Sequence, residues 1–170
     1  MFTLSRLPSP LGELLAITAQ DGTLHALDFA DYVDRLQRLF ARHHPGAAVV
    51  ECPAPTALAA ALTAYFAGDV TALDAVPVAR IGSDFQRKVW AALRAIPAGE
   101  TRSYGQHAAA IGQPTASRAI GLANGANPIG IVVPCHRVIG SGGALTGYAG
   151  GVERKAWLLR HEGALAPLLA

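Results

Sequence analysis

Cys135 and His136 stand side by side in the segment 133–138, Val-Pro-Cys-His-Arg-Val, and are the side chains best suited to covalent chemistry. A thiol is a strong nucleophile only as the thiolate, and an adjacent imidazole can take its proton. The apolar run 129–133 predicts a buried strand that delivers the thiol to a fixed place. The competing interpretation is a buried cysteine that acts only as a small apolar side chain.

The elements that must position this pair begin with the first part of the chain, where apolar and polar residues alternate as they do in the strands of a sheet. Three strands, a helix, a fourth strand and a second helix are expected at 2–7, 13–19, 23–29, 31–43, 48–50 and 56–67. The Asp21-Gly22 pair favours a tight hairpin. The irregular stretch 68–82 is the expected linker. We therefore expect residues 1–80 to form an α/β scaffold domain, a small antiparallel sheet with a packed helix.

The second part, 83–170, is predicted to be mostly helical. Helices are expected at 84–96, 104–111, 116–124 and 152–162, the first three capped by Ser83, Ser103 and Thr115. The second and third of these helices are short, and a turn that contains glycine joins them. This is the outline of a helix-turn-helix.

The charges divide unevenly between the two parts. Residues 1–80 hold five Lys/Arg and eight Asp/Glu, a net charge of −3. Residues 81–170 hold nine Lys/Arg and four Asp/Glu, a net charge of +5. The cysteine of interest lies in the basic part, which suggests a polyanion partner for it. Chance scatter of surface charge is the alternative.

The composition is that of a chain able to bury a core. Of its 170 residues, 51% are hydrophobic and 15% charged, which fits one large domain or two small ones. No apolar stretch reaches the ~18 residues of a transmembrane helix, and residues 1–6 lack a signal-peptide pattern. Two cysteines without a secretory signal favour free thiols in a reducing compartment. We therefore expect a cytoplasmic protein with no membrane partner.

The predicted third helix of the second part is suited to close approach. Residues 116–123 are mostly small, and Arg118 is the one long cation among them. On a basic domain the approaching surface could be DNA, with the arginine on a phosphate or inside a base stack that has lost a nucleotide. Plain helix packing with a solvated Arg118 is the alternative. A thiolate that attacks a base would need such a helix, because a stacked base is out of reach.

Several separated segments form a recognisable set: 85–90, FQRKVW; 99–106, GETRSYGQ; 127–140, NPIGIVVPCHRVIG; 147–151, GYAGG; and 157–163, WLLRHEG. They closely resemble motifs of the O6-alkylguanine-DNA alkyltransferase family (methylated-DNA–protein-cysteine methyltransferases). The resemblance is strong from about 83 to 163 and weaker over 1–80. It implies a ribonuclease-H-like α/β domain followed by a winged helix-turn-helix-like domain that binds DNA and carries the alkyl acceptor.

The resemblance also implies roles around the thiol. Cys135 would accept the alkyl group, and His136 would relay the thiol proton through a water toward Glu162. Glu162 would orient the imidazole and stabilise its charged form. Asn127 would brace the turn between the recognition helix and the active-site strand. Read without the resemblance, Glu162 is a solvated helix-end residue and Asn127 belongs to an ordinary Asn-Pro turn.

Further residues would handle the DNA and the base. Tyr104 would help to rotate the nucleotide and would protonate the departing guanine, although by itself it is a half-buried helix tyrosine. Arg118 would fill the vacated stack. The other residues expected at the DNA are Thr115, Ala116, Ser117 and Gly121, and those expected to hold the base, largely through backbone groups, are Val138, Tyr148 and Ala149.

Two departures from the family bear on these expectations. Ala149 stands where some members carry serine, which removes a hydroxyl contact and alters the tolerance for bulky alkyl groups. Some relatives hold a structural zinc, whereas this chain offers only Cys52, His25, His43 and His44, without ligand-like spacing. We expect no metal and no cofactor.

The expected function is therefore direct reversal of DNA damage by a single-use protein. Cys135 would take the alkyl group irreversibly from a flipped O6-alkylguanine in double-stranded DNA, with O4-alkylthymine left open as a second substrate. The chain is expected to act as a monomer. The alternatives are a non-catalytic lesion-binding protein that recruits other repair factors, a cysteine hydrolase, and a plain helix-turn-helix transcription factor.

Overall fold

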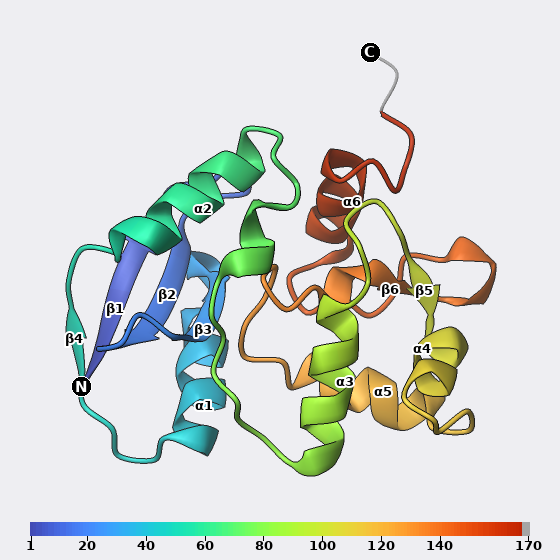
Figure 1. Ribbon diagram of the computed structural model, residues 1–170, viewed down its shortest axis with the longest axis horizontal. Helices are drawn as coiled ribbons and strands as arrows, with labels where there is room; N and C mark the ends of the chain where they lie inside the picture. The colour runs from blue at the N-terminus through green and yellow to red at the C-terminus, as the bar shows by residue number, and fades with distance from the viewer. Residues whose placement is uncertain (168–170) are drawn as a thin grey trace. The chain divides into compact units, whose positions relative to one another are not determined.

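The computed structural model describes residues 1–167, which fall into two compact units (Figure 1). The first unit contains Met1–Ile81 and the short segment Pro128–Val132. The second contains Gly82–Asn127 and residues 133–167. The segment Pro128–Val132 belongs to the first unit because the backbone of Leu27 exchanges hydrogen bonds with it, from Leu27 N to Pro128 O (3.0 Å) and from Gly130 N to Leu27 O (2.9 Å).

The first unit is a four-stranded sheet with helices. Its strands β1 (Phe2–Leu7), β2 (Leu14–Ala19), β3 (Leu24–Phe29) and β4 (Val49–Glu51) lie in the order β3-β2-β1-β4. The pairs β1–β2 and β2–β3 are antiparallel, and β4 lies parallel to β1. The helices are α1 (Val33–His43), α2 (Thr56–Phe66) and the 3₁₀ turns η1 (Ala30–Tyr32) and η2 (Ala72–Ala75).

Alternation of side chains along β2 builds two layers of core. Leu15 and Ile17 point to one face and pack with Leu36 and Phe40 of α1. The residues that alternate with them, such as Leu14, are also buried, and α2 lies over this opposite face (Figure 1). The predicted β2–β3 hairpin is confirmed: Gly22 has a φ of 88°, which glycine adopts without strain.

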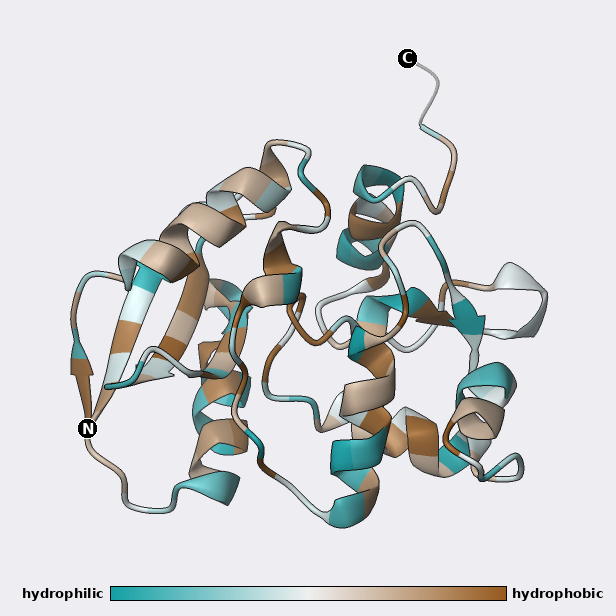
Figure 2. Cartoon of the chain, viewed as in Figure 1, coloured by the Kyte–Doolittle hydropathy of each residue, from teal (hydrophilic) through white to brown (hydrophobic). Residues whose placement is uncertain are grey.

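The second unit is mostly helical. It contains α3 (Asp84–Arg94), α4 (Tyr104–Ala110), α5 (Ser117–Gly125) and α6 (Val152–His161), with the 3₁₀ turns η3 (Cys135–Arg137) and η4 (Ser141–Gly143). Two short strands, β5 (Arg102–Ser103) and β6 (Val138–Ile139), pair in parallel. Figure 2 shows apolar and polar residues interleaved along α3, whose apolar side is buried at Val89, Trp90 and Leu93. The expected order of a small sheet with helices followed by a helical part is confirmed.

Serine caps start two of these helices, as the sequence predicts. Ser83 and Ser103 each accept a hydrogen bond from the backbone N–H three residues later, and the serine N–H donates to the side-chain oxygen of the glutamine there. This reciprocal arrangement satisfies two otherwise unpaired donors at each helix start. The prediction that Thr115 caps the next helix is wrong: the N-cap of α5 is Ala116, without a side-chain cap.

The predicted buried strand at 129–133 is also wrong. Apart from a single bridge between Leu27 and Ile129, this run forms tight turns. Val132 N donates to Gly130 O (2.7 Å) across Ile131, whose φ is 67°. A positive φ is strained for a β-branched residue. The run is nonetheless buried, so its apolar character reports burial and not extended backbone.

Candidate active site

A tight turn presents Cys135. Cys135 N donates to Val133 O (2.9 Å) around Pro134, whose φ of −84° and ψ of 67° are those of an inverse γ-turn. Cys135 then begins η3 and is partly exposed. Proline suits this place because its ring fixes φ near the value that the turn requires. The thiol is therefore held at the start of a rigid bend and stays accessible.

Asn127 braces the same turn. Its side-chain Nδ2 donates to Val133 O (2.9 Å), so one carbonyl accepts from both Asn127 and the Cys135 backbone N–H. The contact ties Asn127, two residues after the end of α5, to Val133, where the turn that presents Cys135 begins. This placement agrees with the bracing role that the resemblance implies for Asn127.

His136 is completely buried and faces a carboxylate. Its Nε2 lies 2.9 Å from Oε2 of Glu162, and both side chains are almost wholly excluded from solvent. The other ring nitrogen, Nδ1, has no hydrogen-bond partner among the described residues. Since Glu162 accepts the proton on Nε2, the lone pair lies on Nδ1. The ring is therefore set up as a base through Nδ1.

Arg137 holds the far side of Glu162. Its Nε and Nη2 donate to Oε1 and Oε2 of Glu162, both at 2.9 Å, and its Nη1 donates to Ile96 O (2.7 Å). A buried carboxylate is stable only when it is paired and hydrogen-bonded. The sequence reasoning missed Arg137, although its place directly after the Cys-His pair was visible.

The protonation of this buried group follows from these contacts. Burial alone would raise the pKa of Glu162, but the hydrogen bonds and charges of His136 and Arg137 outweigh it and hold that pKa well below its ordinary value. Burial lowers the pKa of His136, and Glu162 offsets this only in part. The site therefore rests as carboxylate and neutral imidazole.

Lys155 is a second residue that the sequence reasoning missed. It is 1% exposed, and its Nζ donates to Val138 O (2.6 Å) and Thr146 O (2.9 Å). Burial lowers the pKa of Lys155, while its interaction with Cys135 opposes that shift. A nearby cation favours thiolate over thiol. The signal for Lys155 was its position one turn before Leu158 and Leu159, on the buried face of α6.

Tyr104 lies at the start of α4, between α5 and the glycine-rich loop formed by residues 140–151. Its hydroxyl donates to Thr146 O over a long 3.4 Å. An ideal Cβ built on Gly147 would lie 3.1 Å from that hydroxyl, and one on Gly121 would lie 4.0 Å from the ring. Burial, and then the nearby Cys135, raise the pKa of Tyr104. The hydroxyl therefore keeps its proton and can donate it.

The residues expected to hold the base lie in β6 and in the glycine-rich loop that follows it. Val138 is buried in β6, and its carbonyl accepts from Lys155. The ring of Tyr148 meets His136 edge to face, with centroids 6.4 Å apart. Ala149 is exposed next to it.

The expected DNA-contacting residues cluster on and before α5. Arg118 and Thr115 are exposed, while Ala116, Ser117 and Gly121 are partly buried. Trp90 Nε1 donates to Ala123 O (3.0 Å) and fixes α5 against α3. These residues belong to α5 and the turn before it, whereas His136, Arg137 and Glu162 lie on η3 and at the end of α6.

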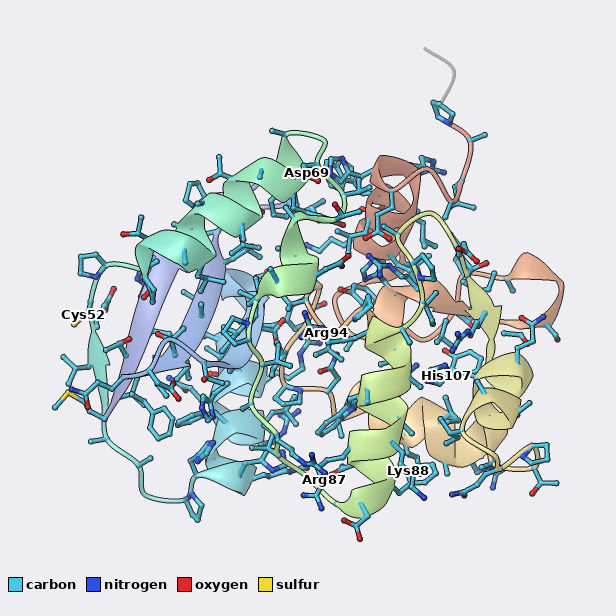
Figure 3. The ribbon with its side chains drawn as sticks, in the orientation of Figure 1. Cys52, Asp69, Arg87, Lys88, Arg94 and His107 are labelled. Atoms are coloured by element: carbon cyan, nitrogen blue, oxygen red, sulfur yellow. The ribbon has the colours of Figure 1, made fainter. Side chains whose placement is uncertain are left out.

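Cys52, the other thiol, is exposed just after β4 in the first unit (Figure 3). No three His, Cys, Asp or Glu side chains gather as metal ligands within residues 1–167. None of the helices described there has the length and apolar content needed to cross a bilayer.

Two family models match the chain. The model of the 6-O-methylguanine DNA methyltransferase ribonuclease-like domain matches residues 4–79. The model of the DNA-binding domain of the same family matches residues 84–164.

Individual proteins agree with the models. The methylated-DNA–protein-cysteine methyltransferase of Salmonella typhimurium is 51% identical over 162 residues, which cover 94% of this chain and 95% of the relative. The crystal structure of Mycobacterium tuberculosis OGT in complex with DNA superposes with a TM-score of 0.79 at 41% identity, covering 95% of this chain and 93% of that one. The M. tuberculosis O6-methylguanine methyltransferase structure gives 0.78 at 41%, over 98% and 96% of the two chains.

Proposed function

The chain belongs to the 6-O-methylguanine DNA methyltransferase family, and from this premise we propose that it repairs O6-alkylguanine in double-stranded DNA by moving the alkyl group to Cys135. The observation that carries the assignment of the acceptor is the buried chain of His136, Glu162 and Arg137 next to a partly exposed thiol. Cys52 has no comparable surroundings among the interactions described for it.

The proton leaves the thiol before the alkyl group arrives. His136 accepts it at Nδ1 through a bridging water, and Glu162 stabilises the imidazolium that results, as a carboxylate does behind a catalytic histidine. Lys155 adds positive charge that favours the thiolate. The unpaired Nδ1 and the ionised Glu162 support this direction of transfer.

The thiolate then displaces guanine from the alkyl carbon. The new bond joins Sγ of Cys135 to that carbon, and the bond from the carbon to O6 breaks with its electrons left on guanine. Tyr104 donates a proton to the leaving base and regains one from solvent, to which the His136 imidazolium releases the proton taken from the thiol. The products are unmodified guanine and a thioether on Cys135. A thioether is a poor leaving group, so each chain acts once.

DNA is the macromolecular partner in this proposal. The nucleotide must leave the stack to reach Cys135; Arg118 would fill the gap, with Thr115, Ala116, Ser117 and Gly121 close to the strand. Val138, Tyr148 and Ala149 would hold the base, and Asn127 keeps the cysteine turn in place. No cofactor takes part. We propose that the chain works as a cytoplasmic monomer.

The test measures the loss of the lesion from the DNA. A duplex with one O6-methylguanine is incubated with increasing amounts of protein, and its nucleosides are quantified after digestion. We expect O6-methylguanine to convert to guanine in proportion to the protein added, ending at one equivalent. Repeated turnover would contradict the single-use mechanism. Tight binding of the duplex without conversion of O6-methylguanine would favour the lesion-binding alternative. The presence of Cys135 argues against that alternative.

A further inference from the structure

Leu122 is an exposed leucine on α5 that has no part in the chemistry above. The residue is 72% exposed. The other large apolar side chain that is exposed in the described part of the second unit is Val152, at 48%. A single exposed leucine needs no explanation by itself, but the residues around Leu122 on α5 point to a role for it.

Leu122 shares a face with the arginine of the same helix. Arg118 is exposed and lies four residues earlier, one turn away on the same side. Gly121, the neighbour of Leu122, lies against the ring of Tyr104. Gly125, one turn further on, is exposed, and a Cβ built there would meet nothing within 4 Å. One surface therefore carries a cation, the edge of Tyr104 and an apolar side chain, with no bulk between them.

We propose that Leu122 touches the DNA substrate at the base step opened by nucleotide extrusion, where it packs against sugar and base edges. This rests on the proposed function. DNA is the favoured occupant because an exposed cation lies one turn away and residues 81–170 carry a net positive charge. Leucine is among the apolar side chains that proteins insert at unstacked steps. Its contribution is apolar and therefore independent of salt.

Salt dependence separates this contact from an ionic one. Binding to a lesion duplex is measured at several salt concentrations in a Cys135→Ser background, which leaves the lesion intact. Leu122→Ala is expected to weaken binding about tenfold at every salt concentration, with an unchanged slope of log K against log[salt]. Arg118→Ala is expected to reduce that slope, by up to about 1. Val152→Ala is the matched control and should bind as the parent does.

Further measurements distinguish failure of the Leu122 proposal from failure of the proposed function. Leu122→Met, which keeps apolar volume, should restore binding. With Cys135 present, Leu122→Ala should accept methyl from free O6-methylguanine base as fast as the parent, because no duplex is involved. Equal duplex affinity of Leu122→Ala and the parent would overturn the proposed role of Leu122 and leave the proposed function intact. The same holds if the free chain self-associates and Leu122→Ala abolishes that association. Failure of the parent to accept methyl at all would instead overturn the proposed function.

Discussion

Glu162 accepts from two different side chains, and each bond has a consequence for the chemistry. The bond from His136 Nε2 fixes which nitrogen of that ring carries the proton. The paired bonds from Arg137 keep the carboxylate ionised although it is buried. A single side chain therefore decides both the tautomer of the base and the stability of its charged form.

Replacement of this carboxylate by the matching amide tests the charge and not the shape. Glu162→Gln is expected to slow methyl transfer by about 10²-fold or more, because the imidazolium loses its stabilising charge. Single-turnover rates with a lesion duplex measure the effect, and duplex affinity should stay the same. Glu153→Gln, on the exposed first turn of α6, is the control. A rate within twofold of the parent would remove Glu162 from the mechanism.

At the scale of elements, the turn before Cys135 depends on Asn127 as a donor. Asn127→Asp places a carboxylate oxygen against Val133 O, where the amide N–H now donates. We expect methyl transfer to slow by about tenfold or more, since the buried carbonyl of Val133 loses one of its two donors and faces like charge. Gln37→Glu adds the same charge at an exposed position of α1 and should leave the rate unchanged. Full activity of Asn127→Asp would show that the turn holds without this bond.

In the first unit, a histidine pair joins β3 to the end of α1. His25 Nδ1 and His44 Nε2 lie 2.9 Å apart, and both rings contact Phe2. One nitrogen donates and the other accepts, so the contact requires at least one neutral ring. Burial, and for His25 also the charge of His44, lower the pKa of both residues, while Asp21 works in the opposite direction on His25.

Acid should therefore loosen this unit. The unfolded chain binds protons at the ordinary histidine pKa, and the folded one only below it, so the stability present above pH ~6.5 is lost as the pH falls toward the lowered values. Hydrogen exchange of β3 and α1 amides should show protection falling from pH 7 to 5.5. His44→Gln should flatten this dependence. His161→Gln, in the second unit, should not. Equal slopes for His44→Gln and the parent would refute the prediction.

Local patterns in the sequence predicted the starts of α3 and α4, whereas other features depend on contacts between distant parts of the chain. The bonds that cap α3 and α4 at Ser83 and Ser103 span three residues, so they are legible in the sequence. Arg137 finds Glu162 and Ile96 at separations of 25 and 41 residues, which no local pattern reveals. The turns at 129–133 were missed because an apolar run looks alike in a buried strand and a buried turn.

The net charge of the whole molecule is unevenly distributed, negative over residues 1–80 and positive over residues 81–170, and DNA binding should reflect this. Arg118, the cation that the proposal assigns to DNA, lies in the basic second part, which also carries Arg87 and Lys88 on α3; Figure 3 labels the two residues on α3. Phosphate contacts release counterions and carry no sequence information. The expected binding is therefore salt-sensitive and indifferent to sequence.

Affinity for undamaged duplexes tests this directly. Between about 50 and 200 mM salt we expect a loss of roughly 10²-fold or more, of similar size for duplexes of unrelated sequence. Fluorescence anisotropy with several labelled duplexes measures both properties. Affinity that survives high salt, or that differs tenfold between sequences, would contradict the electrostatic account.

The most direct test of the central claim, that Cys135 is the alkyl acceptor, is the intact mass of the protein after reaction with an O6-methylguanine duplex, followed by peptide mapping. The account predicts a gain of one methylene per chain, located on Cys135, present in Cys52→Ser and absent in Cys135→Ser. A methylated Cys52, or a mass gain that persists in Cys135→Ser, would contradict it.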